Sequence, residues 1–450
     1  MSTAVHSGAY VQKARLIAQD ELPQLFRTPS PAPRLDGKAL RDFCSRLHDE
    51  LSALYPDILE ATRSETAFTR PDCEEAVSSS LEYVRGFPDY LAGLPREETP
   101  PQIYRDDRGE RQIELRDVPW GTVAVILPQS AFLILSLTCL LNALATGNRV
   151  ILRVPAQSMR SGELLSLAID GANPPPDSVY VVLAQGRAFV QALCESRQPI
   201  LLHYLGSSAH APEILSDCFR AGKHAIIDGE GNAWVWVDED VPPDRACDLL
   251  TSGALRYNGQ TCTSVNGAVI HPGVYDRLKE RLVARWSEIT FGNPPAEDVQ
   301  VGPVMSEEQA EQCLSRINAG GGKVLVGGCR DGNLLAPTLI AEPAEESDLV
   351  SDGLFGPALW IAPGDMDFFA RLWQTNRYPL CAGILSANPD HVEHLRELPG
   401  LARLVINGDP SLEHIYEPWG GYPASGTNPV GPWHRKYLRT LQLDRPVPPR

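Results

Sequence analysis

The chain has 450 residues, of which 43% are hydrophobic and 22% charged, and its formal net charge is -17. This length and composition predict a folded enzyme with two or three sizeable cores. The excess of negative charge argues against nucleic acid and anionic membrane surfaces as partners.

The first hundred residues are typical of helices, and Leu40 to Leu54 carries apolar residues at helical spacing. Gln102 to Val118 differs, because Asp106-Asp107-Arg108-Gly109 is a turn signal between two polar, strand-like arms. Arms this polar predict an exposed or subunit-bridging ribbon. Near the end of the chain, Thr440 to Leu443 is strand-like and is a candidate partner for that ribbon.

From Trp120 onward, predicted strands and helices alternate. The strands are Thr122 to Leu127, Arg149 to Val154, Ser178 to Leu183 and Ile200 to Leu205, and the helices are Ala131 to Ala145, Ser161 to Ile169, Arg187 to Glu195 and Pro212 to Ala221. This alternation predicts a parallel sheet with helices on both faces. Such sheets bind ligands at the carboxyl ends of their strands, although no G-x-G-x-x-G fingerprint follows any of these strands.

A second α/β unit follows Gly229. Its predicted strands are Ala233 to Val237, Gly267 to His271, Lys323 to Val326, Ala358 to Ile361, Ala382 to Leu385 and Leu404 to Ile406, with helices at Pro242 to Leu255, Val274 to Glu288 and Met366 to Thr375. The apolar stretch Leu133 to Ala145 is too short for a membrane span and predicts a buried helix.

The ten cysteines are scattered, with no CxxC pair and no Cys/His cluster of zinc spacing. This usage is typical of a reduced cytosolic protein, and the N-terminus lacks the apolar core of a signal peptide. We therefore expect a cytoplasmic protein without a metal site.

One cysteine stands in a distinctive loop, Asn258-Gly-Gln-Thr-Cys262-Thr-Ser264. A polar loop with glycine can leave a sulfur accessible, lower its pKa and offer backbone N–H groups to an oxyanion. The alternative for Cys262 is a buried, inert cysteine.

Further motifs stand around this loop. They are Pro119-Trp-Gly121, Ala143-Leu-Ala-Thr-Gly-Asn148, Gly206-Ser-Ser208, Phe355-Gly-Pro357 and Pro418-Trp-Gly-Gly421. In this order and spacing, from about Trp120 to Tyr437, the chain resembles a divergent member of the aldehyde dehydrogenase superfamily.

The resemblance implies an α/β fold with two doubly wound parallel-sheet domains and a small β oligomerisation ribbon. Residues 1–101 and 119–228 would form the N-terminal helices and the cofactor-binding domain, and residues 229–405 the catalytic domain. Residues 102–118 and 430–450 would form the oligomerisation ribbon and tail of a homodimer or homotetramer.

The resemblance also implies the chemistry. Cys262 would be the nucleophile, and NAD or NADP the hydride acceptor. Asp228 stands at the position of the family's general base, with Glu230 as a competitor two residues later. Ser130 replaces the usual asparagine of the oxyanion hole and can still donate one hydrogen bond.

The resemblance also implies, position by position, a set of cofactor-binding residues and a set of substrate-binding residues. The cofactor set is Leu127, Pro128, Arg153, Ala156, Gly206, Ser207, Gly229 and Phe355, and the substrate set is Arg256, Phe132, Thr261, Thr263 and Trp419. Arg256 stands where some semialdehyde-oxidising relatives hold the substrate carboxylate; the alternative is an arginine paired with a nearby acid. Gly353 replaces a glutamate that holds the nicotinamide ribose, and Ala156 with Arg153 predicts that NADP is accepted.

The predicted function is NAD(P)-dependent oxidation of a small aldehyde, such as a semialdehyde or other anionic aldehyde, to a carboxylic acid through a thiohemiacetal and a thioacyl enzyme. One alternative is an acylating relative that passes the acyl group to coenzyme A or reduces an acyl thioester or acyl phosphate. Another is a catalytically impaired subunit. Asp228 and the intact cysteine loop favour the hydrolytic enzyme.

Overall fold

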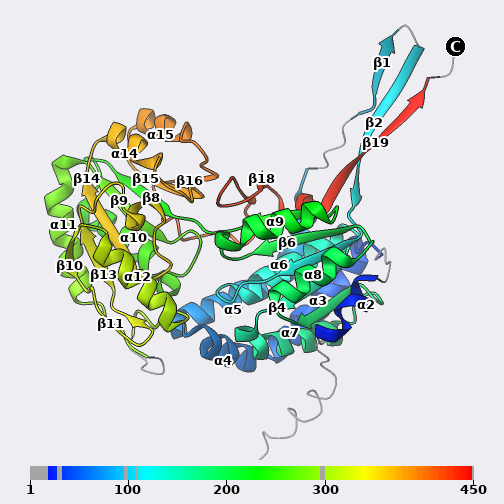
Figure 1. The fold of residues 1–450 in the computed structure, drawn as a ribbon, viewed down its shortest axis with the longest axis horizontal. Coiled ribbons are helices and arrows are strands. Elements are labelled where there is room, and N and C mark those ends of the chain that lie inside the picture. Colours follow the sequence, from blue (N-terminus) through cyan, green and yellow to red (C-terminus); the bar gives the residue numbers. More distant parts are fainter. Residues whose placement is uncertain (1–18, 28–32, 96–99, 107–108, 294–298, 448–450) are drawn as a thin grey trace, which may run out of the picture.

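A computed structural model describes residues 19–27, 33–95, 100–106, 109–293 and 299–447. The predicted turn residues Asp107 and Arg108, the N-terminus and the last three residues of the tail lie outside the described residues. The two sheets occupy separate lobes, and a long ribbon projects from one of them (Figure 1).

The first lobe contains a five-stranded sheet with the strand order β5-β4-β3-β6-β7. The strands are β3 (Thr122–Ile126), β4 (Arg149–Val154), β5 (Val179–Leu183), β6 (Ile200–Leu205) and β7 (His224–Asp228). All neighbouring pairs are parallel. Since the chain starts in the middle and runs outward to both edges, the sheet is doubly wound, as predicted.

Helices cover both faces of this sheet because its strands are apolar on both sides. One core joins the sheet to α3 (Gly37–Ala53), α4 (Tyr55–Thr66), α5 (Arg70–Gly93), α6 (Phe132–Ala145) and α7 (Met159–Ala172). The other core joins it to α2 (Leu22–Arg27), α8 (Gly186–Glu195) and α9 (Ala211–Arg220). Along β3, Val123 and Val125 face the first core, and Ala124 and Ile126 face the second.

The second lobe contains a seven-stranded sheet with the order β10-β13-β14-β9-β8-β15-β16. Its strands are β8 (Ala233–Val237), β9 (Val265–Ile270), β10 (Lys323–Val326), β13 (Thr338–Ala341), β14 (Ala358–Pro363), β15 (Cys381–Leu385) and β16 (Arg403–Ile406). Only the β10–β13 pair is antiparallel. The helices α10 (Pro243–Leu255) and α11 (Pro272–Ser287) cover one face, and α12 (Glu307–Ala319), α13 (Asp348–Ser351), α14 (Met366–Trp373) and α15 (Pro389–Arg396) cover the other.

The projecting ribbon consists of β1 (Gln102–Asp106), β2 (Gly109–Pro119) and β19 (Leu438–Pro446). β19 pairs antiparallel with β2, with Thr440 opposite Asp117. The predicted pairing of the polar ribbon with the C-terminal strand is therefore confirmed. Several apolar side chains of the ribbon are exposed, among them Ile103, Tyr104, Leu115 and Leu441.

Several shorter elements complete the fold. They are the 3-10 helices η1 (Gln19–Glu21), η2 (Ala156–Ser158), η3 (Ser208–His210), η4 (Arg256–Gly259) and η5 (Trp433–Tyr437), and the strand pairs β11 (Arg330–Asp331) with β12 (Leu334–Leu335) and β17 (Trp419–Gly421) with β18 (Asn428–Gly431). In the described ranges, no helix is both long and apolar enough to cross a membrane. The domain boundaries at residues 228 and 405 remain predictions.

Candidate active site

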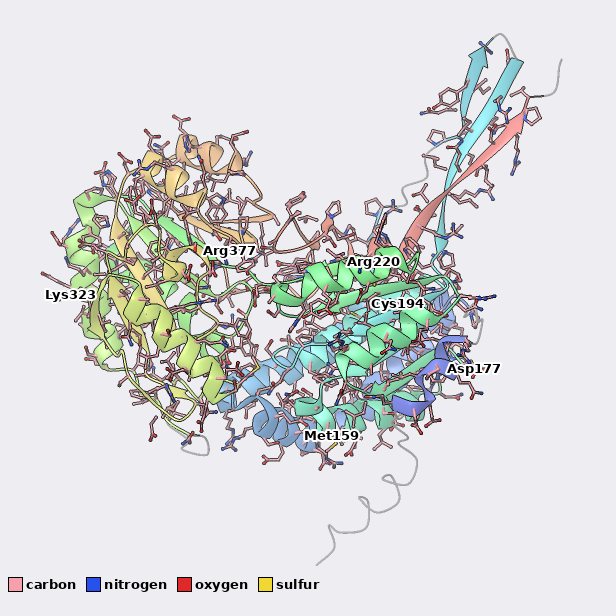
Figure 2. The ribbon with its side chains drawn as sticks, viewed as in Figure 1. Met159, Asp177, Cys194, Arg220, Lys323 and Arg377 are labelled. Carbon is pink, nitrogen blue, oxygen red and sulfur yellow. The ribbon has the colours of Figure 1, made fainter. Side chains whose placement is uncertain are left out.

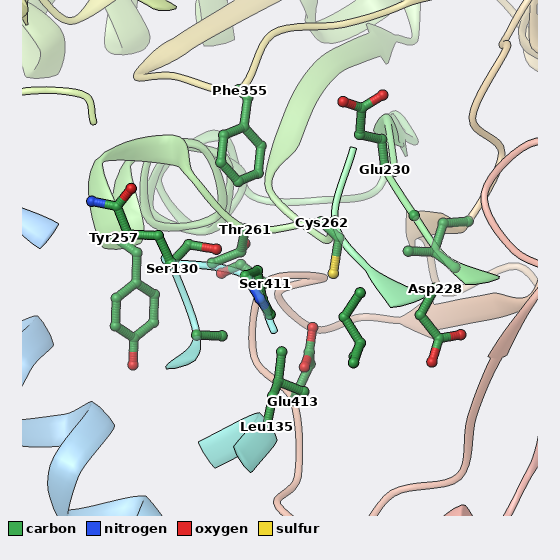
Figure 3. A pocket seen from close by; sticks show the side chains of 18 of the residues that line it. Ser130, Leu135, Asp228, Glu230, Tyr257, Thr261, Cys262, Phe355, Ser411 and Glu413 are labelled. Atoms are coloured by element: carbon green, nitrogen blue, oxygen red, sulfur yellow. The ribbon is translucent and has the colours of Figure 1, made fainter. Parts of the chain in front are cut away.

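A cavity of about 560 Å³ is lined by residues from both lobes. Pro128, Ser130 and Gly206 come from the first lobe, and Cys262 and Phe355 come from the second. The volume lies within the range of roughly 300–1,000 Å³ that is typical of small-molecule sites. Figure 3 shows the sulfur of Cys262 among these side chains.

The cysteine loop has a constrained backbone. After α10 ends, Tyr257, Asn258 and Gly259 have φ angles of 52°, 56° and 67°, in the left-handed region. The side chain of Asn258 holds this shape, because its Nδ2 donates to the Pro303 carbonyl (3.0 Å) and its Oδ1 accepts from the Gly302 amide (2.8 Å). A Cβ on Gly259 would come within 2.2 Å of the Gly356 oxygen. The loop therefore requires asparagine and glycine in these positions.

The sulfur of Cys262 reaches the cavity, but its pKa differs from our expectation. Burial raises the pKa of Cys262 well above its ordinary value of 9.0, and the negative charges of Glu413 and Asp228 raise it further. The free chain therefore does not show the lowered pKa that the polar glycine loop was expected to provide. Because the surrounding charges are carboxylates, the thiol is the favoured form in this state.

Ser130 lies where the resemblance placed it. It precedes α6 and lines the same cavity as Cys262 and Thr261. Figure 3 shows Ser130 and Thr261 together on one side of the sulfur. Thr261 is held by its hydroxyl contact with Ser264, at 2.8 Å. The role of Ser130 as an oxyanion donor remains a prediction.

Asp228 ends β7 and also lines the cavity, and one of its two carboxylate oxygens is engaged, whereas its buried Oδ1 has no hydrogen-bond partner among the described residues. Its Oδ2 accepts from Lys436 Nζ at 2.7 Å and contacts His203 Nε2 at 2.8 Å. His203 Nδ1 in turn contacts the Tyr437 hydroxyl at 2.8 Å. Asp228 and Lys436 are 8% and 4% exposed, so this is a buried ion pair.

The ion pair makes Asp228 a poor general base. Although burial alone raises the pKa of Asp228, the charge of Lys436 and the contact with His203 lower it well below its ordinary value. A carboxylate with so low a pKa accepts protons weakly. Figure 3 shows its carboxylate turned away from the sulfur of Cys262. This geometry does not favour Asp228 as the residue that activates water, and its role as the base remains a prediction. Through Lys436, Asp228 contacts the C-terminal segment.

Glu230, the competing candidate, faces the first lobe. Its Oε1 accepts from the Ser207 hydroxyl at 2.9 Å, and its amide donates to the Ser208 hydroxyl at 2.9 Å. Figure 3 shows its carboxylate on the opposite side of Cys262 from Glu413. Glu230 therefore lies beside Ser207, one of the predicted cofactor residues.

All of the predicted cofactor residues except Phe355, which lies in the second lobe, gather at one edge of the five-stranded sheet. Leu127 and Pro128 follow β3, Arg153 and Ala156 lie at the end of β4, Gly206 and Ser207 follow β6, and Gly229 follows β7. Carboxyl ends of parallel strands form the usual ligand edge of such sheets. Of this set, Pro128, Gly206, Ser207, Gly229 and Phe355 line the cavity, whereas Leu127, Arg153 and Ala156 do not.

This edge fits a dinucleotide. A Cβ on Gly229 would lie 2.3 Å from the Ser208 hydroxyl, and one on Gly206 would lie 2.9 Å from the Tyr204 hydroxyl. Neither position therefore has room for a side chain unless its neighbour moves. Arg153 donates its Nε to the Ala184 carbonyl at 2.8 Å, and burial lowers its pKa. These residues would hold NAD or NADP.

The structure explains why position 353 holds a glycine and not the glutamate that, in the family, holds the nicotinamide ribose. Gly353 has a φ of +69°, and a Cβ there would come within 2.5 Å of Asn232 Oδ1. No longer side chain fits at this position without strain. Its neighbour Asp352 contacts Arg377 at 2.8 Å and Arg316 at 3.6 Å. Figure 2 shows Arg377 on the side of its lobe that faces the other lobe.

The predicted substrate residues divide into two groups. Arg256, Thr261 and Trp419 line the cavity, whereas Phe132 is packed in the core and Thr263 is fully buried. The structure therefore does not bring Phe132 and Thr263 to the cavity wall. Arg256 pairs through Nη2 with Glu75 of α5, and its buried Nη1 has no hydrogen-bond partner among the described residues.

Sequence reasoning missed Glu413. It lies in the loop between β16 and β17 and lines the cavity, and its Oε1 accepts from the Thr263 hydroxyl at 2.7 Å. Its only sequence signal is its place five residues before the Pro418-Trp-Gly-Gly421 motif. It also missed Lys436, the partner of Asp228.

Comparison with known proteins identifies the class of this fold and site. A sequence model of the aldehyde dehydrogenase family matches residues 14–440. The chain is 26% identical to 1-pyrroline-5-carboxylate dehydrogenase of Bacillus mycoides over 370 residues, which cover 79% of this chain and 70% of that protein. It is 24% identical to alpha-ketoglutaric semialdehyde dehydrogenase of Bacillus subtilis over 406 residues, which cover 88% and 82%.

The fold agrees with these matches. The crystal structure of aldehyde dehydrogenase 21 from Physcomitrella patens in complex with succinate superposes with a TM-score of 0.85 at 23% identity, covering 95% of this chain and 90% of that chain. The chain belongs to the aldehyde dehydrogenase family. The predicted fold and the prediction of an NAD(P)-dependent oxidoreductase that converts an aldehyde to a carboxylic acid are confirmed at this level.

Proposed function

We propose that the substrate is a semialdehyde or another small aldehyde with an anionic end, and that Arg256 binds this end. The observation that carries the proposal is the position of Arg256 in the wall of the cavity that contains Cys262. A guanidinium matches a carboxylate with two parallel hydrogen bonds. The relatives named above include a semialdehyde dehydrogenase, which supports the same substrate class.

In the free enzyme, Arg256 forms an ion pair with Glu75. The carboxylate of the substrate would take the place of Glu75. The Glu75 side chain is 48% exposed, whereas that of Arg256 is 16% exposed. A pair with one exposed partner contributes about 0–1 kcal/mol to stability, so exchange of Glu75 for a substrate carboxylate costs little. The arginine is thereby held in place in the absence of substrate.

The remaining roles follow from the family and the cavity. Cys262 attacks the aldehyde carbon, and NAD or NADP, when bound, accepts the hydride of the thiohemiacetal. Ser130 and the backbone amide of Cys262 donate hydrogen bonds to the developing oxyanion. Phe355 lines the cavity and would contact the cofactor.

The test compares a four-carbon semialdehyde with butanal, which has the same length and no charge. In Arg256→Gln, KM for the semialdehyde is expected to rise roughly 10- to 100-fold, the equivalent of a lost hydrogen bond between charged groups. KM for butanal should not change. Glu75→Gln, which frees Arg256, should lower KM for the semialdehyde. Equal effects of Arg256→Gln on both substrates would reject the proposal.

A second candidate function is acyl transfer to coenzyme A. The ion pair of Asp228 with Lys436 favours it, because the carboxylate at the usual position of the general base is paired with a buried cation. In that case the wild-type enzyme releases one burst of NAD(P)H in buffer and stalls, and coenzyme A restores turnover. Sustained turnover in buffer alone would reject it.

We also propose that the chain assembles through the ribbon as a homodimer or homotetramer and acts in the cytoplasm. Exposed strand edges are normally paired or protected, and both edges of the ribbon, β1 and β19, are open in the single chain. The exposed Ile103 and Leu441 give these strands apolar surface to bury.

A further inference from the structure

Release of the acid requires a base close to the acyl carbon on Cys262. Six carboxylates line the cavity, and they are Glu75, Asp228, Glu230, Asp352, Glu413 and Glu417. Four of them form ion pairs: Glu75 with Arg256, Asp228 with Lys436, Asp352 with Arg377, and Glu417 with Arg403. Within the described residues, Glu230 and Glu413 form none, so the choice of a free carboxylate is between these two.

Glu413 is hydrogen-bonded to the loop that carries Cys262. Its Oε1 accepts the hydroxyl proton of Thr263, the residue after Cys262, at 2.7 Å. Thr263 is fully buried and therefore fixes the direction of the carboxylate. Figure 3 shows the carboxylate of Glu413 on the side to which the sulfur of Cys262 points, whereas that of Glu230 lies on the other side.

The electrostatics agree with this geometry. Glu413 as a residue is exposed where it faces the open cavity, but the protein packed around its carboxylate raises the pKa of Glu413 above its ordinary value of 4.5. Thr263, Arg403 and Arg256 lower this pKa, and Glu417 raises it. Glu413 raises the pKa of Cys262 more than Asp228 does, and it is the strongest charge acting on the sulfur. A carboxylate with a raised pKa is a better proton acceptor than one in an ion pair.

We propose that Glu413 is the general base that activates the water for release of the acid. The inference rests on the proposed aldehyde oxidation and concerns its second half. The water oxygen forms a bond to the acyl carbon while Glu413 takes one proton of the water. The tetrahedral intermediate then collapses, the carbon–sulfur bond breaks, and the sulfur of Cys262 takes the proton from Glu413. The acid leaves, and no further reactant is consumed.

The first test separates acylation from deacylation in Glu413→Gln. This variant should release one stoichiometric burst of NAD(P)H, and its steady-state rate should fall by roughly 10²–10⁴-fold. The acyl adduct on Cys262 should then be visible by intact-protein mass spectrometry. Hydroxylamine, a stronger nucleophile than water, should restore turnover. Glu397→Gln, an equivalent change at an exposed site, should behave as wild type.

Two further variants keep the proposal testable if Glu413→Gln is unstable. Glu413→Asp retains a base and should restore part of the rate. Thr263→Val retains the carboxylate but removes its hydrogen bond, and should slow deacylation roughly five- to tenfold. In the wild type, the steady-state rate should rise with pH as Glu413 loses its proton, with a pKa above the ordinary value of glutamate. Glu413→Gln should not show this rise.

Several outcomes would overturn the assignment. They are undiminished steady-state turnover in Glu413→Gln, a stall in Glu230→Gln instead, or a rise in KM at constant kcat, which would make Glu413 a substrate-binding group. If the wild-type enzyme gives no burst with any aldehyde, the proposed function itself fails. A normal wild-type burst with unaffected deacylation in Glu413→Gln rejects Glu413 alone.

Discussion

The buried pair of Asp228 and Lys436 makes a strong prediction about stability. Their side chains are 6% and 1% exposed, and the two charged atoms are 2.7 Å apart. Removal of one partner leaves an uncompensated charge in the interior, which costs about 3–5 kcal/mol. Asp228→Asn and Lys436→Met should each lose about this much free energy of unfolding. The double variant leaves no buried charge and should lose less than either single variant.

Urea denaturation followed by intrinsic fluorescence measures these differences. Asp89→Asn is the matched control, because Asp89 pairs with Arg41 at the surface, where the side chains are 75% and 53% exposed. Asp89→Asn should lose less than about 1 kcal/mol of its free energy of unfolding. A loss below about 1 kcal/mol in Asp228→Asn, or additive losses in the double variant, would refute the buried ion pair.

The same pair sets the acid dependence of stability. The folded pKa of Asp228 lies below its unfolded value, so its contribution is complete above the unfolded pKa of about 4 and is lost as the pH falls below that value. Lys436→Met should weaken this acid dependence, because the charge that lowers the pKa is gone. An unchanged pH profile of unfolding would show that Lys436 does not act on Asp228.

Three further predictions concern other parts of the molecule. Gly259→Ala should greatly reduce activity, because its Cβ would meet the Gly356 oxygen at 2.2 Å; wild-type kcat would show that the loop tolerates a shift. Light scattering at micromolar concentration should show a dimer or tetramer, and deletion of residues 438–450 should give smaller species; a wild-type monomer contradicts this. Calorimetric titration should detect NADP binding, because Ala156 lacks the carboxylate that repels a 2′-phosphate; tight NAD binding without NADP binding excludes it.

Much of the fold could be predicted because buried parallel strands have continuous apolar runs. β6 (Ile200–Leu205) matches its predicted range residue for residue, and all six residues are buried. β7 (His224–Asp228) was missed because it begins with an exposed histidine and contains only a short apolar pair. α12 (Glu307–Ala319) was missed because it buries only three residues, Ala310, Cys313 and Ile317.

The site was predictable where its residues are close in sequence. The loop at Cys262 could be found because its polar and glycine residues are consecutive. The environment of Asp228 could not, because Lys436 is 208 residues away and no pattern connects the two. Glu413 is 150 residues from Thr263, and only the fold brings the two together. The raised pKa of Cys262 follows first from burial in the folded chain and then from these distant carboxylates, and neither cause can be deduced from the local sequence.

The most direct test of the account is the turnover of Cys262→Ala. The variant should bind NAD(P) with the affinity of the wild type, because the predicted cofactor residues that line the cavity are unchanged. With aldehyde and cofactor present, it should form neither a burst nor a steady state of NAD(P)H. Wild-type rates of NAD(P)H formation in Cys262→Ala would contradict the proposed mechanism.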